Sequence, residues 1–499
     1  MQSLFQASII NTFSGIASMA AGFGSTVLVA RLLGAEGTGL TAFALWLVFS
    51  AYALADRGIP ATVLRYVGQR NGKENTEQDL VRQLYPKFIW PVLLLTVAFA
   101  AYSFWHSDNP VDGSTGFWLV TSLLFVTYCH SQLAIAADHG RGDYVGPATK
   151  VVIGCLLQLP VIAVGAYYFG AAGAMAGHFA RHVPQSLAIV RHLKHGSSLD
   201  TPVNKQIIRY SRNSWISSTL TVLVRTRVEF IFIGVFFSLT EVGYFAAAIT
   251  FSSLIFQLAL AMTAGLSARF ARLREAGELE RMGNTYQRAL RWMALLLFPV
   301  SFGGAAVIQE ILPMVFGDEF RPAVATASVL IALAFAQCLV SLPLSMMLAH
   351  ERDKTVMIMN AVSAAVLLVL NLAIIPSFSG FGAAWVKSIV AFAGFSWALW
   401  YCQTRLGLVP GIRSLFGLAA SAGTCAGVAW LVLVEVQGLP GLLSAIAAGA
   451  LIYLLGIRLT GAMLPDDVDS LRTTLRKILP AAMVKPAIWI VSQLAVRRV

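Results

Sequence analysis

Charged side chains interrupt an apolar run at residues 222–237, which read VLVRTRVEFIFIGVFF. Arg225 and Glu229 are four residues apart, so on a helix they would share one face and neutralise each other, whereas Arg227 would point elsewhere. A charge at the bilayer centre costs about 2.5–3.5 kcal/mol on insertion scales and usually faces protein or a water-filled cavity. Two interpretations stay open: an intrahelical ion pair beside a snorkelled arginine, and a cavity-facing arginine beside a carboxylate.

Basic groups lie inside other apolar runs. The segment at 177–184 reads GHFARHVP, in which His178, Arg181 and His182 share much of one helix face. Two histidines four residues apart can bind zinc, but no carboxylate or cysteine stands nearby in the sequence, so a positive face turned toward a cavity is favoured. Lys387, in GFGAAWVKSIVAFAGF, has no acidic residue near it.

A second charged stretch, ADRGIPATVLRYVG at 55–68, contains Asp56, Arg57 and Arg65, and its Gly58 and Pro60 predict a break or kink in the helix. Within the apolar runs bases outnumber acids. The bases are Arg57, Arg181, Arg225, Arg227 and Lys387, and the acids are Asp56 and Glu229. Surplus positive charge favours an anionic substrate that carries diphosphate or carboxylate groups.

Composition defines the elements that must position these residues. Of 499 residues, 57% are hydrophobic and 12% are charged, which is typical of a polytopic membrane protein. The net charge of +12 is explained by basic loops between apolar runs, so we expect no nucleic-acid partner. The cysteines fall in apolar runs without metal-ligand spacing, which predicts small buried side chains, neither disulfides nor metal ligands. They are Cys129, Cys155, Cys338, Cys402 and Cys425.

Apolar windows of about 20 residues predict an all-α chain with about fourteen transmembrane helices. The first begins in MQSLFQASIINTFSG, which lacks the basic region of a removed signal. Even-numbered connections are basic and odd-numbered ones, such as HSDNPVDGS at 106–114, are neutral or acidic, which predicts cytoplasmic termini. The predicted spans are 7–30, 38–66, 87–105, 116–137, 148–168, 172–190, 208–237, 241–265, 288–308, 324–349, 355–377, 380–403, 412–435 and 440–462.

A weak internal repeat divides the chain. A shift of 204 residues pairs Gly39 with Gly243, and a slightly larger shift pairs Gly173 with Gly382. Because the shift covers six spans, the two halves have the same orientation, which predicts two six-helix lobes related by a parallel pseudo-two-fold axis. The lobes are 1–195 and 205–405. Residues 410–463 form two additional helices, and 464–499 a cytoplasmic tail that is either amphipathic on the inner leaflet or solvated.

The chain resembles the polysaccharide flippases of the multidrug/oligosaccharidyl-lipid/polysaccharide exporter superfamily, which translocate O-antigen and exopolysaccharide precursors. The resemblance rests on VARLLGAEGTGLTAFALW (29–46), ALADRGIPATVLRYVGQ (53–69), EFIFIGVFFSLTEVGYFAAA (229–248), PMVFGDEFRPA (313–323) and the run from Met346 to Val386. It covers nearly the whole chain in the same order. Each motif alone is weak.

The resemblance implies a bacterial inner-membrane flippase that moves an undecaprenyl-diphosphate-linked oligosaccharide by alternating access, without enzymatic chemistry or a cofactor. Asp56 and Glu229 would either pair with the cations or bind a coupling H⁺ or Na⁺. Polysaccharide polymerase and assembly proteins would be partners beside the lipid bilayer. The residues expected to bind the anionic headgroup are Arg65, Arg181, Arg225, Arg227, Arg269, Lys387 and His178.

Other functions remain alternatives. Surplus acidic residues in the cavity would favour an ion-coupled drug or metabolite exporter, whereas the sequence has surplus basic residues. A flippase for peptidoglycan lipid precursors belongs to the same superfamily. A polysaccharide polymerase or ligase would need a large external loop, which the span pattern does not contain, and no GxxxxGK[ST] stretch supports ATP-driven transport.

Overall fold

The computed structural model describes residues 4–67, 74–105, 114–194, 204–225, 227–263, 265–409 and 411–463. Within these ranges the structure is helical throughout, apart from a short 3-10 turn at Asp318–Phe320 and the connecting residues. The chain separates into two compact units, Met1–Ala246 and Ala247–Val499. Nothing in the structure tests the predicted lobe boundaries, and the predicted cytoplasmic tail at 464–499 lies outside the described residues.

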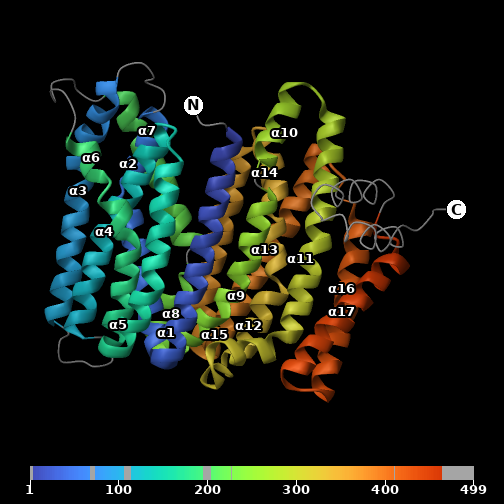
Figure 1. Cartoon of the computed structure of the whole chain (residues 1–499). Coiled ribbons are helices and arrows are strands. Elements are labelled where there is room, and N and C mark those ends of the chain that lie inside the picture. The colour runs from blue at the N-terminus through green and yellow to red at the C-terminus, as the bar shows by residue number, and fades with distance from the viewer. Residues whose placement is uncertain are drawn as a thin grey trace. The chain divides into compact units, whose positions relative to one another are not determined.

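The first unit contains the helices from α1 onward up to the start of α9 (Figure 1). Its elements are α1 (Leu4–Ala55), α2 (Ile59–Val67), α3 (Glu74–Trp105), α4 (Thr115–Gly140), α5 (Val145–Ser186), α6 (Ile189–Lys194), α7 (Lys205–Arg225), α8 (Glu229–Phe236) and the first part of α9 (Leu239–Thr263). Large apolar side chains from α3 and α4, among them Phe88, Phe117 and Phe125, form the centre of its core.

The second unit contains the rest of α9 and the helices that follow it. These are α10 (Leu266–Glu275), α11 (Leu279–Phe316), α12 (Ala323–Ala332), α13 (Ala334–Leu339), α14 (Ser341–Ala349), α15 (Asp353–Leu406), α16 (Ile412–Glu435) and α17 (Gly438–Thr460). The last two pack along each other as a hairpin and also contact α11 (Figure 1). They correspond to the two additional helices that the sequence predicts.

Several helices are unusually long because each contains two predicted spans joined by a sharp turn. Nine helices in the described ranges are long and apolar enough to cross a membrane, or ten if the bent α12–α14 segment is one span. Three of the longest contain a residue with non-helical backbone: Gly34 in α1, Gly170 in α5 and Ser379 in α15. Each lies between two predicted spans, so it marks a sharp turn at which one span ends and the next begins. The chain is therefore a multi-pass membrane protein.

Two of these turns agree with the predicted repeat. Gly170 has φ 57° and ψ −139°, and Ser379 has φ 50° and ψ −142°. The two residues are 209 positions apart, which is the shift that pairs Gly173 with Gly382. A positive φ is uncommon outside glycine, so Ser379 keeps a turn geometry that its own side chain disfavours.

The five cysteines are all buried, as the sequence predicts.

Candidate functional site

A helix break separates α1 from α2 and positions Asp56. Helix α1 ends at Ala55 and α2 begins at Ile59, which confirms the break predicted from Gly58 and Pro60. Asp56 is buried and its Oδ1 accepts a hydrogen bond of 2.9 Å from the backbone N–H of Gly58. Arg57 has a φ of 50°, a conformation that costs a non-glycine residue about 1–3 kcal/mol and persists only where surrounding contacts enforce it.

Helix α7 supplies these contacts. Three of its side chains, spaced four residues apart on one face, donate hydrogen bonds to carbonyl oxygens freed by the break. Ser211 Oγ donates to the carbonyl of Arg57 at 2.8 Å. Thr219 Oγ1 donates to that of Ala53 at 2.9 Å. An unsatisfied carbonyl within a membrane costs several kcal/mol, so this stripe makes the break tolerable.

The third member of the stripe, Trp215, bridges two carbonyls. Its Nε1 lies 3.1 Å from the oxygen of Ala53 and 3.2 Å from that of Leu54. The helices approach so closely that a Cβ atom at Gly58 would overlap the carbonyl oxygen of Ser211. Gly58 also has a φ of 68°, so glycine is required here for both spacing and conformation.

Helix α5 brings Arg181 and His178 to one amide. Gln158, on the first half of α5, is fully buried. Its Oε1 accepts a hydrogen bond of 3.0 Å from Nη1 of Arg181, and its Nε2 lies 3.2 Å from Nδ1 of His178. Arg181 and His178 are on the second half of α5 and are half-buried. Of the residues predicted to bind substrate, these two are joined through a residue that the sequence analysis did not single out.

Aromatic rings connect the Asp56 turn with the next turn of α5. Tyr52, one helical turn before Asp56, packs edge-on against Tyr128 of α4 with ring centroids 5.1 Å apart. Tyr128 packs edge-on against His182 at the same distance, and His182 Nδ1 lies 3.4 Å from Ser131 Oγ. Polar and aromatic groups from α1, α4 and α5 therefore form one continuous set inside the first unit.

A second break corrects the interpretation of Arg225 and Glu229. Helix α7 ends at Arg225 and α8 begins at Glu229, so the two residues do not occupy successive turns of one helix. The assumption of a continuous helix at 208–237 was wrong, whereas the pairing of Arg225 with Glu229 stays a prediction. Arg227 has a φ of 36°, and its guanidinium lies 5.8 Å from the centroid of the Phe230 ring. Glu229 is fully buried at the first turn of α8.

The other predicted binding residues belong to other helices. Arg65, in the last turn of α2, is exposed, and its guanidinium carbon lies 4.6 Å from the centroid of the Tyr210 ring. Arg269 is exposed on α10 and Lys387 is half-buried on α15, both in the second unit. Thus Arg65 stacks on an aromatic side chain of α7.

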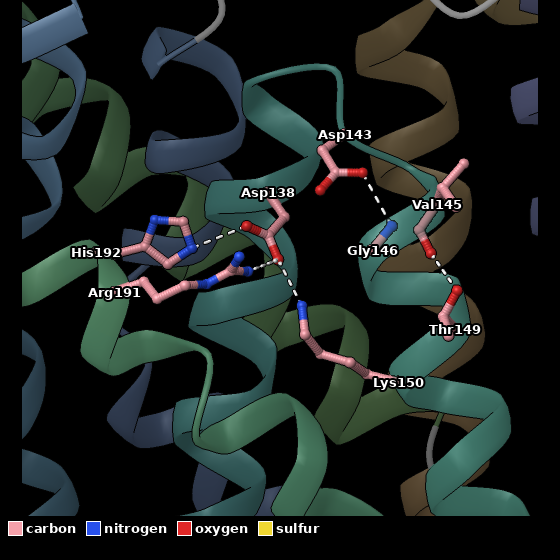
Figure 2. Close-up of polar contacts among 8 residues, drawn as sticks. All are labelled: Asp138, Asp143, Val145, Gly146, Thr149, Lys150, Arg191 and His192. Carbon is pink, nitrogen blue, oxygen red and sulfur yellow. Dashed lines mark hydrogen bonds and ion pairs between the residues drawn. The ribbon is translucent and has the colours of Figure 1, made fainter.

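A charged cluster at the end of α4 was missed by the sequence analysis (Figure 2). The buried Asp138 carboxylate lies 2.9 Å from Nε2 of His192. Its second oxygen lies 3.5 Å from Nζ of Lys150 and 3.8 Å from Nη2 of Arg191. His192 is buried, whereas Arg191 is mostly exposed. One carboxylate therefore ties the end of α4 to α5 and to the short helix α6.

No group of three potential metal-ligating side chains occurs in the part of the chain that the structure describes. The chemistry of the site is that of a guanidinium, imidazoles, an amide and two separate buried carboxylates. These groups can bind and orient charged ligands through hydrogen bonds.

The family is shown by a sequence comparison. The family model for "polysaccharide biosynthesis protein" matches residues 28–325, more than half of the chain. None of the curated proteins matches the chain.

Solved structures show the same fold at low identity. The structure titled "Lipid II flippase MurJ, inward closed conformation" has a TM-score of 0.72 and 14% identity, covering 91% of this chain and 98% of that one. An inward-facing multidrug resistance MATE transporter of the MOP superfamily has a TM-score of 0.63 and 15% identity, covering 76% and 93%. A MOP superfamily transporter from Pyrococcus furiosus, described as having reverse polarity of its binding pocket, has a TM-score of 0.54 and 14% identity, covering 79% of this chain and 94% of that one.

The helix order, the paired spans and the family match give one conclusion: the chain belongs to the polysaccharide biosynthesis protein family and has the fold of MOP superfamily transporters.

Proposed function

We propose that this protein is a flippase that moves an undecaprenyl-diphosphate-linked oligosaccharide across the bacterial inner membrane by alternating access. The observation that carries the proposal is Arg181, a half-buried arginine in the spanning helix α5 that donates a hydrogen bond to the neutral amide of Gln158. A charged side chain within a membrane-spanning helix is expected to face protein or water. The guanidinium of Arg181 is suited to bind a diphosphate.

The family description supports a role in polysaccharide assembly, and the fold supports transport. Asp56 and Glu229 would hold the nearby cations or take up a coupling H⁺ or Na⁺, because both are buried beside helix breaks. Polymerase and assembly proteins would receive the product on the outer face.

A flippase for a peptidoglycan lipid precursor is the second candidate. It is favoured by the high coverage of the structure of MurJ, a lipid II flippase. The two candidates share a lipid-linked anionic headgroup and differ in the sugar that it carries, so a substrate comparison separates them.

The test is translocation in proteoliposomes. Fluorescent undecaprenyl-diphosphate oligosaccharide and lipid II would be compared in wild type, in Arg181→Ala and in Arg321→Ala, whose arginine is exposed. We expect wild type to move the oligosaccharide substrate, Arg181→Ala to lose most of this activity, and Arg321→Ala to retain it. Movement of lipid II alone would favour the second candidate. Absence of translocation of either lipid by wild type would overturn the proposal.

A further inference from the structure

The residue between Arg181 and His178 is neutral, although it holds a charged group. Gln158 is fully buried, and a buried amide is costly unless its polar atoms are hydrogen-bonded. Both polar atoms of this amide have a hydrogen-bond partner: Oε1 contacts Arg181, and Nε2 contacts His178. The contact therefore satisfies Gln158 and at the same time fixes the two basic side chains relative to each other.

The backbone of α5 is built to allow this contact. The helix reverses direction at Gly170, and its two halves pack closely. A Cβ atom at Gly154 would overlap the carbonyl oxygen of Arg181, and one at Gly177 would lie 2.8 Å from the backbone nitrogen of Ile162. Small residues permit such close helix packing in membranes. Gln158, one turn after Gly154, is thereby brought within hydrogen-bond distance of the opposite half.

The chemistry of the amide determines what the site presents. Gln158 Oε1 accepts from only one of the five N–H groups of the guanidinium, and as an amide it leaves the positive charge uncompensated. Because the amide nitrogen of Gln158 is a donor, Nδ1 of His178 is the acceptor, which places the imidazole proton on Nε2. The arrangement thus offers one full positive charge and additional N–H donors in fixed positions.

We propose that Gln158 is a positioning residue that orients Arg181 and His178 to bind the anionic diphosphate headgroup, and that its neutrality sets the anion preference of the site. This rests on the proposed function. A glutamate at the same position would keep the geometry but pair with the arginine, so the site would lose its net charge. An apolar side chain of similar length would keep the charge but release the arginine from its orientation.

The test is ligand binding to the purified full-length protein in nanodiscs. Farnesyl diphosphate and the uncharged farnesol would be titrated into wild type, Gln158→Glu, Gln158→Met and the control Gln185→Met. Gln185 is also a buried glutamine on α5, and its Oε1 has no hydrogen-bond partner among the described residues. Translocation of the lipid-linked oligosaccharide by wild type would be measured in parallel.

We expect Gln158→Glu to weaken farnesyl diphosphate binding by about tenfold or more and Gln158→Met to weaken it by about tenfold. Farnesol binding should be unchanged in both variants, and Gln185→Met should match wild type for both ligands. A general packing defect would instead lower binding of both ligands together. The Met variant preserves the test if Gln158→Glu does not fold.

Two results would overturn the inference in distinguishable ways. If wild type binds the diphosphate and both Gln158 variants bind it equally well, Gln158 has no positioning role, while the proposed function stands. If wild type neither binds the diphosphate nor moves the lipid-linked oligosaccharide, the proposed function fails and the anion site fails with it.

Discussion

Gly39 and Gly243 pack against each other in a symmetric contact. A Cβ atom on Gly39 would overlap the carbonyl oxygen of Leu239, and one on Gly243 would overlap that of Ala35. Each glycine therefore meets the carbonyl four residues before the other, and both pairs are related by the shift of 204 residues found in the sequence. A contact in which equivalent residues exchange roles is the pattern produced by a two-fold axis.

We expect Gly39→Ala and Gly243→Ala each to destabilise the protein by about 1–3 kcal/mol, because the added methyl group has no room and the helices must separate. Thermal unfolding in detergent would measure the loss. The matched control is Gly427→Ala in α16, where nothing lies within 4 Å of an added Cβ atom and alanine favours the helix. Unchanged unfolding of both variants would contradict the close contact.

The Asp138 cluster predicts an unequal loss of stability among its members. Asp138→Asn should cost about 1.5–3 kcal/mol, since His192 and Lys150 would lose a partly buried charged partner. Arg191→Ala should cost at most about 1 kcal/mol, because that side chain is 64% exposed and its contact is long. Urea or thermal unfolding of the three proteins would rank them. Equal losses would show that the carboxylate is not the centre of the cluster.

The stripe on α7 predicts non-additive effects. Trp215→Phe and Thr219→Val should each destabilise by about 0.5–1.5 kcal/mol, because the carbonyl of Ala53 keeps one of its two donors in either variant. The double variant removes both donors and should cost more than the sum. A double-mutant cycle by thermal unfolding tests this. Additivity would mean that water replaces the lost donors.

The sequence was a good guide to the spans because the membrane requires about 20 apolar residues for each crossing. The turns at Gly34, Gly170 and Ser379 fall between predicted spans for this reason. The break at Gly58 was also predictable, since proline and glycine disfavour a continuous helix. The break before Glu229 was not, because the residues around it carry no glycine or proline.

The candidate site was harder to predict, since a search for charges finds only part of it. His178 and Arg181 drew attention as ionisable residues, but Gln158 is neutral and 20 positions away from His178. Ser211 and Thr219 look like ordinary polar residues of a helix, and their role depends on a break in another helix. Asp138 lies in the last turn of α4, one residue beyond the predicted span 116–137, so the sequence analysis did not count it among the charges inside the spans. In each case the missing information was which helices pack together.

The last prediction concerns Lys387, a half-buried cation in the second half of α15. If the proposed function holds, Lys387→Ala should reduce translocation of fluorescent undecaprenyl-diphosphate oligosaccharide by about tenfold, a loss typical of a charged contact. Lys354→Ala, at the exposed start of the same helix, controls for the loss of a lysine and should retain wild-type rates at matched protein levels. Because a lysine that only stabilises the fold would change unfolding rather than transport, both are measured. Transport equal to wild type in Lys387→Ala would exclude this residue from the substrate path.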